Sequence, residues 1–184
     1  MTLQIIGGKY KGRRLSSPKH DSTRPTQGML REAVFNICQL EIVGAHLLDL
    51  YAGSGAMGLE ALSRGAAHVT FVEKKRDAIL CIKKNIESLG VKEASTLLAR
   101  DAMEALMQCK EPFDLIYIDP PYDLSTRAIL EKIASSHLLK TEGTLFLEER
   151  FDPHKKANPF QPDGLQLKKS RKFGIALLHQ YRAT

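Results

Sequence analysis

The sequence contains no long apolar run and few cysteines, and each shortage narrows the kinds of protein that it can encode. No window of the 184 residues approaches the roughly 20 apolar residues of a membrane-spanning helix, and the charged N-terminus lacks the pattern of a signal peptide. The three cysteines, Cys38, Cys81 and Cys109, are widely spaced and form no CxxC pair, which argues against a disulfide framework and a zinc site. We therefore expect a cytoplasmic protein with reduced thiols, no bound metal and no membrane contact.

The composition is that of an ordinary globular domain. Hydrophobic residues make up 43% of the chain and charged residues 26%, and a chain of this length can bury a substantial core. We expect a single domain over residues 1–184, in which a small N-terminal appendage (residues 1–40) packs against a core that spans residues 45–184. Because no apolar stripe suggests a subunit interface, a monomer is expected.

The positive charge is concentrated at the two ends of the chain. Residues 1–31 contain seven Lys and Arg against one Asp, residues 32–151 contain 13 basic and 18 acidic residues, and residues 152–184 contain seven basic and two acidic residues. Basic ends beside an acidic centre attract polyanions through phosphate contacts that do not read sequence. We therefore favour a nucleic-acid partner, although a solvated basic face without a partner would give the same counts.

From residue 45 onward, short apolar segments alternate with segments of helical spacing. This alternation predicts an α/β fold, with a parallel sheet buried on both faces. Strands are expected at residues 46–51, 68–73, 95–99, 113–118 and 143–148, and helices at about 56–64, 75–89, 102–109 and 125–138.

The two ends of the chain have a different pattern. Residues 165–169 and 175–182 are expected to form a terminal antiparallel hairpin around a basic turn at 171–174. In the N-terminal appendage we expect a hairpin (residues 3–6 and 12–15), followed by a helix that Thr26 caps and that runs to about Leu40.

A glycine turn follows the first predicted strand. The apolar run Leu47–Tyr51 leads into Gly53-Ser54-Gly55 and then directly into a helix, so the chain matches GxGxxG. Glycines allow a sharp turn and a close approach of the backbone to a ligand, and the start of the helix presents unpaired N–H groups. The motif alone is weakly specific, but its strand–turn–helix context predicts a nucleotide-like ligand.

Three carboxylates add to this prediction. Glu73 ends the second strand, 20 residues after Gly53, where a carboxylate can accept hydrogen bonds from ribose hydroxyls. Asp101 follows the third strand and is placed to bind an adenine amino group, directly or through its backbone neighbour Ala102. Asp49 lies just before the glycines, where its charge disfavours a pyrophosphate, and hence NAD, and suits a ligand with ammonium and sulfonium groups. Acidic residues at helix starts also stabilise the helix dipole, so Glu73 or Asp101 alone would be ambiguous.

The sharpest signal is Asp119-Pro120-Pro121-Tyr122, directly after the fourth strand. The prolines remove two backbone donors and leave carbonyl groups. Asp119 and the Pro120 carbonyl would each accept one N–H of an exocyclic amino group, and Tyr122 would stack on the base. Orientation then supplies most of the catalysis, and no metal is needed. A proline-rich turn with a packed tyrosine is the structural alternative.

Taken together, several segments resemble the RsmD family of methyltransferases. They are DLYAGSGAMGLEALSRG, FVEK, DPPY and RPTQGMLREAVFN (Arg24–Asn36). The resemblance covers essentially the whole chain and implies a Rossmann-like class I methyltransferase fold, with a seven-stranded, mostly parallel sheet. It also implies S-adenosylmethionine at the glycine turn, Glu73 and Asp101, and methylation of the N2 amino group of a guanine in small-subunit (16S) rRNA. The chain has Gly28 and Met29 where the family commonly has an acidic and a basic residue.

The basic N-terminus then acquires a role, because its side chains would hold RNA phosphates and so position the RNA. The candidate residues are Lys9, Lys11, Arg13, Arg14, Arg24 and Thr26. The expected partner is small-subunit rRNA, in an assembling ribosomal particle.

Three alternative functions remain. A DNA or other RNA amino-methyltransferase, acting on adenine N6 or cytosine N4, would share the glycine turn and DPPY. A NAD(P)-dependent oxidoreductase would share only GxGxxG. An RNA-binding module without catalysis would leave the intact Asp119–Tyr122 quartet unexplained.

Overall fold

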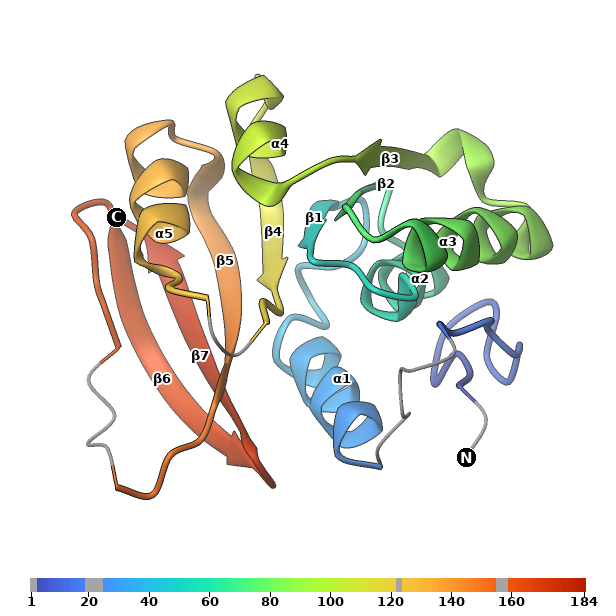
Figure 1. The fold of residues 1–184 in the computed structure, drawn as a ribbon, viewed down its shortest axis with the longest axis horizontal. Coiled ribbons are helices and arrows are strands. Elements are labelled where there is room, and N and C mark those ends of the chain that lie inside the picture. The colour runs from blue at the N-terminus through green and yellow to red at the C-terminus, as the bar shows by residue number, and fades with distance from the viewer. Residues whose placement is uncertain (1–2, 19–24, 122–123, 155–158) are drawn as a thin grey trace.

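The computed structural model describes residues 3–18, 25–121, 124–154 and 159–184. Within these ranges seven strands form one sheet in the order β3-β2-β1-β4-β5-β7-β6 (Figure 1). The strands are β1 (His46–Leu50), β2 (His68–Glu73), β3 (Ser95–Ala99), β4 (Phe113–Ile118), β5 (Leu139–Arg150), β6 (Leu165–Phe173) and β7 (Ala176–Ala183). The helices are α1 (Pro25–Ile37), α2 (Ala56–Ser63), α3 (Arg76–Leu89), α4 (Ala102–Gln108) and α5 (Arg127–Ser135), with a short 3₁₀ turn at Lys92–Ala94.

The pairing of the strands confirms the predicted sheet. The five strands from β3 to β5 are parallel to their neighbours, whereas β7 runs antiparallel to both β5 and β6. Parallel neighbours require crossover connections, and the helices between the strands supply them. The order reverses between β1 and β4, so the carboxyl ends of these two strands flank the position where ligands bind in such sheets.

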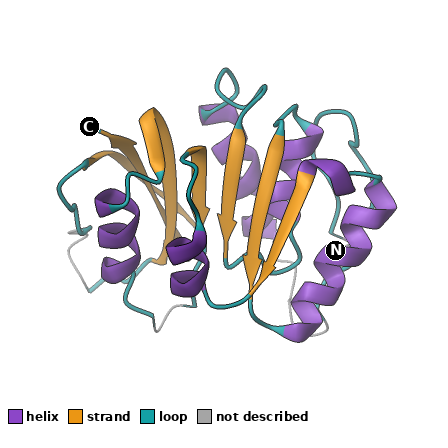
Figure 2. Cartoon of the chain, turned by 90° about the horizontal axis from the view of Figure 1, so that it is seen from above, coloured by secondary structure: helices purple, strands orange, loops and turns teal. Residues whose placement is uncertain are grey.

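Helices cover both faces of the sheet, as Figure 2 shows from above. On one face, side chains of α1, α2 and α3 pack with alternate strand residues such as Leu47 and Phe71. On the other face, α4 and α5 pack with the intervening residues, such as Leu48 and Val72. Because successive strand side chains point to opposite faces, a strand buried on both faces has a nearly continuous apolar sequence. This is why the apolar runs located β1 to β4 within a residue.

The predicted boundaries were less accurate where no apolar run marks them. Strand β5 begins at Leu139 instead of residue 143, and its pairing with β4 shifts register between Phe113 and Leu115. In the terminal hairpin, β6 continues to Phe173, so the predicted basic turn at 171–174 was wrong for its first three residues. The chain reverses at Gly174, whose φ of 57° is left-handed. The basic side chains therefore lie along an edge strand, where charge opposes pairing with other chains.

The N-terminal segment forms a less regular hairpin than predicted. A single bridge joins Gln4 and Arg14, and the N–H of Leu15 donates to the carbonyl of Leu3 at 2.9 Å. Helix α1 begins at Pro25, so Thr26 lies inside the helix and does not precede it as a cap. A proline suits the first helical position because its missing donor would have no partner there.

A buried glutamate on α2 fixes the N-terminal segment to the core. Glu60, whose side chain is 0% exposed, accepts the N–H groups of Ile6 at 2.7 Å and Gly7 at 2.8 Å. Its other contacts are with Arg64, whose Nε donates at 2.7 Å, and with Arg31 of α1 at 3.6 Å. A buried charge requires such partners. The carboxylate thus holds the N-terminal segment, α1 and α2 in one arrangement beside the sheet.

Two helical glycines give a matched test of this packing. A Cβ on Gly58 of α2 would lie 2.4 Å from Phe71 Cε1 and 2.6 Å from Val69 Cγ1, whereas a Cβ on Gly28 of α1 would meet nothing within 4 Å. We expect Gly58→Ala to lower the free energy of unfolding by about 1–3 kcal/mol. Gly28→Ala should raise it by about 0.5–1 kcal/mol, because alanine favours the helix. Urea titrations of both variants measure the unfolding free energies, and equal changes in the two variants would contradict the close packing at Gly58.

Candidate active site at the strand carboxyl ends

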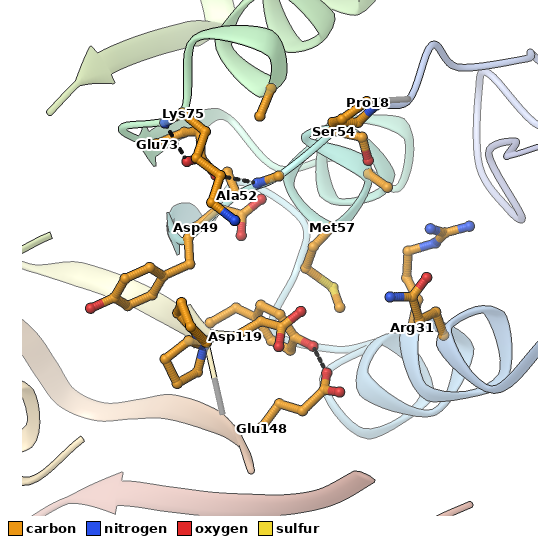
Figure 3. A pocket seen from close by; sticks show the side chains of 18 of the residues that line it. Pro18, Arg31, Asp49, Ala52, Ser54, Met57, Glu73, Lys75, Asp119 and Glu148 are labelled. Carbon is orange, nitrogen blue, oxygen red and sulfur yellow. Dashed lines mark hydrogen bonds between the residues drawn. The ribbon is translucent and has the colours of Figure 1, made fainter. Parts of the chain in front are cut away.

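A cavity of about 500 Å³ opens at the carboxyl ends of β1, β2, β4 and β5. Its walls come from the glycine turn, from these strand ends, from α1 and from the N-terminal segment (Figure 3). It therefore lies where the strand order reverses. Seven of the residues that the sequence singled out line it, namely Asp49, Gly53, Ser54, Glu73, Asp119, Pro120 and Pro121.

The glycine turn places backbone in the cavity wall. Gly53 and Gly55 both have left-handed φ angles, 55° and 78°, which only glycine adopts at little cost. Gly53 and Ser54 line the cavity. A Cβ on Gly55, by contrast, would lie 3.2 Å from Ile82 and 3.4 Å from Phe71, so this side of Gly55 faces the core. Gly55 shapes the turn and begins α2 without being part of the lining.

Glu73 is held rigidly beside that turn. Its Oε2 accepts the N–H of Gly53 at 2.9 Å, and its Oε1 accepts the N–H groups of Lys74 and Lys75, both at 2.8 Å. A carboxylate has about four lone-pair sites, so Oε2 retains one acceptor position for a hydroxyl. The bond from Gly53 couples the end of β2 to the glycine turn, and the bonds from Lys74 and Lys75 fix the orientation of the carboxylate.

Asp49 is a fully buried acid in the cavity wall. The residue is 1% exposed, and its Oδ2 accepts the N–H of Gly58 at 2.9 Å. Burial and, to a smaller extent, the charge of Glu73 raise the pKa of Asp49 to about 7, although the Gly58 hydrogen bond opposes the rise. Asp49 thus changes charge near neutral pH and gains stabilisation from any cation that enters the cavity.

Asp101 and Ala102 do not line the cavity. Asp101 caps α4, where its Oδ1 accepts the N–H of Met103 at 3.0 Å. Its Oδ2 pairs with Lys74 Nζ at 3.0 Å, and this hydrogen bond is the main reason that the pKa of Asp101 lies below its ordinary value. The helix-capping alternative therefore describes the observed contacts of Asp101, and its contact with adenine stays a prediction.

Asp119, Pro120 and Pro121 follow β4 directly and form the wall opposite Glu73. The N–H of Asp119 donates to the carbonyl of Leu50 at 3.3 Å, which ties this segment to the end of β1. Pro120 and Pro121 have no backbone N–H, so these two positions present only carbonyl groups. Tyr122, which was expected to stack on a base, lies outside the described residues.

Sequence analysis missed several residues of the wall. Tyr117 donates its hydroxyl to Glu148 Oε2 at 2.7 Å. Burial raises the pKa of Tyr117 well above its usual value, and the charges of Glu148, Asp119 and Asp49 add to that rise. Three carboxylates thus surround one hydroxyl, so the cavity favours cations and N–H donors. Glu148 is the last residue of the predicted fifth strand (143–148), although β5 continues to Arg150, so the strand-end argument used for Glu73 would have found it.

Two further wall residues have weaker signals. Arg31, which is 6% exposed, donates from Nη2 to the carbonyl of Gln4 at 2.8 Å, and it lies in the segment that carried the family resemblance. Tyr51 has a φ of 62° at the end of β1, a strained conformation for a residue with a side chain. No pattern in the sequence indicates that strain.

The proposed RNA-binding residues of the N-terminal segment lie outside the cavity. Lys9, Lys11, Arg13 and Arg14 are exposed, on the segment that Figure 1 shows beside α2 and α3. Arg13 Nη2 donates to the carbonyl of Ser88 at 2.8 Å. Arg24 lies outside the described residues, as does the side chain of Thr26. Leu3 and Pro18 of the same segment line the cavity, whereas none of these four basic residues is among its described lining residues.

The strand order, the antiparallel β7 and the glycine turn beneath a strand-end cavity define the class I methyltransferase fold. A family model described as conserved hypothetical protein 95 matches residues 3–182, so the chain belongs to this family, the RsmD family. Among the described residues, no helix is long and apolar enough to cross a membrane.

Individual proteins agree with this assignment. The chain is 39% identical to ribosomal RNA small subunit methyltransferase D of Escherichia coli K12 over 143 residues, which cover 78% of the chain and 69% of that protein. It is 30% identical to the protein of the same name from Haemophilus influenzae over 186 residues, 98% and 93% of the two chains. The solved structure of Escherichia coli yhhF superposes with a TM-score of 0.87 at 30% identity, over 100% and 98% of the chains.

Proposed function

We propose that the protein transfers a methyl group from S-adenosylmethionine to the N2 amino group of a guanine in small-subunit rRNA. The names of its relatives support methylation of small-subunit rRNA. Two structures of the same fold were solved with such ligands: SMU.776 with S-adenosylhomocysteine, and the 16S rRNA methyltransferase RsmC of Thermus thermophilus with S-adenosylmethionine and guanosine. The observation that carries the proposal is that Glu73, Asp49 and the Asp119–Pro121 segment line one cavity.

The residues of the wall fit this cofactor, which would supply an electrophilic methyl group on its sulfonium. Asp49, a buried acid in the cavity wall, would stabilise a ligand with two positive centres. The remaining acceptor position on Glu73 suits a ribose hydroxyl. The backbone of Gly53 and Ser54 allows close approach of the ligand. A contact between Asp101 or Ala102 and the adenine is part of the proposal, although neither lines the cavity.

Asp119 and Pro120 would orient the reacting amino group. The Asp119 carboxylate and the Pro120 carbonyl each accept one N–H, which turns the nitrogen lone pair toward the methyl group. The nitrogen loses one of these protons as its bond to carbon forms, and Asp119 is placed to accept that proton. Holding the nitrogen at the correct distance and angle supplies most of the rate enhancement. Tyr122 would stack on the base.

Transfer of radiolabelled methyl groups to unmodified small ribosomal subunits tests the proposal. Label recovered as N2-methylguanosine after nucleoside analysis supports the cofactor, the substrate class and the target atom together. Label absent from rRNA but present in DNA, as methylated adenine or cytosine, supports the alternative amino-methyltransferase. Cofactor binding without transfer to either nucleic acid contradicts both. Naked rRNA, tested in parallel with subunits, shows whether an assembling particle is the substrate, and sedimentation of the enzyme tests for a monomer.

The basic N-terminus should serve RNA binding and not cofactor binding. We expect Arg24→Ala to weaken turnover on subunits and to reduce the slope of log affinity against log salt by about one, because one phosphate contact is lost. The affinity for S-adenosylmethionine should not change. Lys92 is an exposed basic residue in the turn before β3, and Lys92→Ala serves as the control. An equal loss of cofactor affinity in Arg24→Ala would contradict a role in RNA binding.

A further inference from the structure

Glu148 stands between the candidate active site and a second cavity. The second cavity, of about 520 Å³, is lined by Leu124, Thr126, Phe151 and Pro153, among others. Of the residues that the structure describes, Pro120, Pro121 and Glu148 line both cavities. Two of these shared residues belong to the segment that would hold the target amino group, so Glu148 is the remaining side chain at the junction.

The sheet places Glu148 beside Asp119. Strands β4 and β5 are parallel, and Ile118 pairs with Leu147, so Asp119 and Glu148 are the next residues on neighbouring strands. Such strands lie about 4.8 Å apart. Figure 3 shows both side chains pointing into the same space. Two carboxylates are thus presented side by side at one edge of the sheet.

One oxygen of Glu148 is committed and the other is not. Oε2 accepts the hydroxyl of Tyr117 at 2.7 Å, which fixes the orientation of the carboxylate. Within the part of the chain that the structure describes, Oε1 has no hydrogen-bond partner. It is also absent from the group of fully buried polar atoms without partners, which contains only Arg31 Nε, Arg100 Nε and His179 Nε2. Glu148 as a whole is only 7% exposed and lines both cavities. Oε1 is therefore an acceptor that faces these cavities.

The chemistry of guanine fits this pair of acceptors. In guanine the ring N1–H and the exocyclic N2–H₂ are neighbouring donors that point in the same direction. In adenine and cytosine, the ring nitrogen next to the amino group carries a lone pair instead of a hydrogen. An ionised carboxylate beside the acceptor for the amino group therefore attracts guanine and repels the other two bases.

We propose that Glu148 selects the target base, by accepting the N1–H of guanine on Oε1 while Asp119 accepts an N2–H. This inference rests on the proposed function and adds a specificity-determining residue to it. Burial raises the pKa of Glu148, while the hydrogen bond from Tyr117 opposes that rise and favours the carboxylate.

Glu149 provides a matched control on the same strand. Its Oε1 accepts the hydroxyl of Thr126 at 3.1 Å, and its Oε2 lies 3.3 Å from His179 Nε2. Oε1 is therefore hydrogen-bonded and Oε2 faces the His179 ring, and of the two cavities Glu149 lines the second and not the first. Glu149→Gln removes a carboxylate one residue away without removing the acceptor that the proposal assigns to N1–H.

The test compares guanine with 2-aminopurine at the modified position of rRNA reassembled into subunits. 2-Aminopurine keeps the amino group but has a lone pair at N1. We expect the wild type to methylate guanine at least about 10²-fold faster than 2-aminopurine, because a site built for a donor rejects a base that lacks it. In Glu148→Gln the amide can donate to that lone pair, so the ratio should fall below about 10. Glu149→Gln should keep the wild-type ratio, and cofactor affinity should be unchanged in all three proteins.

Each outcome has a distinct meaning. A wild type that does not prefer guanine, or a Glu148→Gln variant that keeps both the rate and the preference, overturns the role of Glu148. The absence of N2-methylguanosine from the wild-type reaction overturns the proposed function itself. If Glu148→Gln does not fold, Tyr117→Phe, which releases Oε2 without removing the carboxylate, should reduce the preference in the same direction. Unchanged preference in that variant would also count against the proposal.

Discussion

Replacing Asp119 by alanine is expected to reduce methyl transfer by about 10³-fold or more while S-adenosylmethionine still binds. Loss of a positioned group that orients a nucleophile and accepts its proton has effects in the range of about 10²–10⁴-fold. The backbone at Asp119 is held by the bond of its N–H to the carbonyl of Leu50 and by the two prolines that follow. The variant should therefore retain the shape of the cavity.

Single-turnover transfer from radiolabelled cofactor measures the effect, and calorimetry of cofactor binding shows whether the site is intact. Asp119→Asn keeps a carbonyl acceptor but cannot take up a proton, so its rate should lie between those of the wild type and Asp119→Ala. Substantial residual transfer by Asp119→Ala would remove Asp119 from the mechanism. A parallel loss of cofactor affinity would instead assign it to binding.

The outline of the site could be predicted because strand ends are visible in the sequence. Apolar runs marked where β1, β2 and β4 end, and the parallel sheet brings these ends together. Glu73 and Asp119 were found in this way. Asp101 shows the limit of the argument, because the same position also suits a helix cap and a partner such as Lys74, and only the folded chain shows which contacts form.

Other parts of the site depend on contacts that no local pattern records. Glu60 occupies an apolar helix and accepts backbone N–H groups more than 50 residues earlier in the chain. Arg31 reaches the cavity only because α1 is held in place by that anchor. The beginning of β5 was misplaced because residues 140–143 (KTEG) interrupt the apolar pattern. In the structure the strand is irregular at this point, with a φ of 63° at Glu142 and a register shift opposite β4.

The second large effect concerns Asp49, whose burial should lower the unfolding free energy of the cofactor-free protein. A pKa raised from 3.8 to about 7 corresponds to about 4 kcal/mol at 1.36 kcal/mol per unit. Because the folded state holds this proton more tightly than the unfolded state, the unfolding free energy falls as the pH rises from about 4 to 7, and the full cost persists above that range. Asp49→Asn is neutral at every pH and retains an acceptor for Gly58, so it should be more stable than the wild type by up to about 4 kcal/mol at pH 8.

Urea unfolding of both proteins at pH 5 and pH 8 isolates this contribution, because other titrating groups are common to both. A difference that does not grow with pH would contradict the assignment of the raised pKa to Asp49. The same charge should serve cofactor binding, since an incoming ammonium or sulfonium lowers the pKa of Asp49 and favours its ionised form. The wild type should therefore bind S-adenosylmethionine more tightly at pH 8 than at pH 6, whereas Asp49→Asn should bind it weakly and without that dependence. A variant that is more stable yet binds less cofactor would show that the buried charge is kept for the ligand and not for the fold.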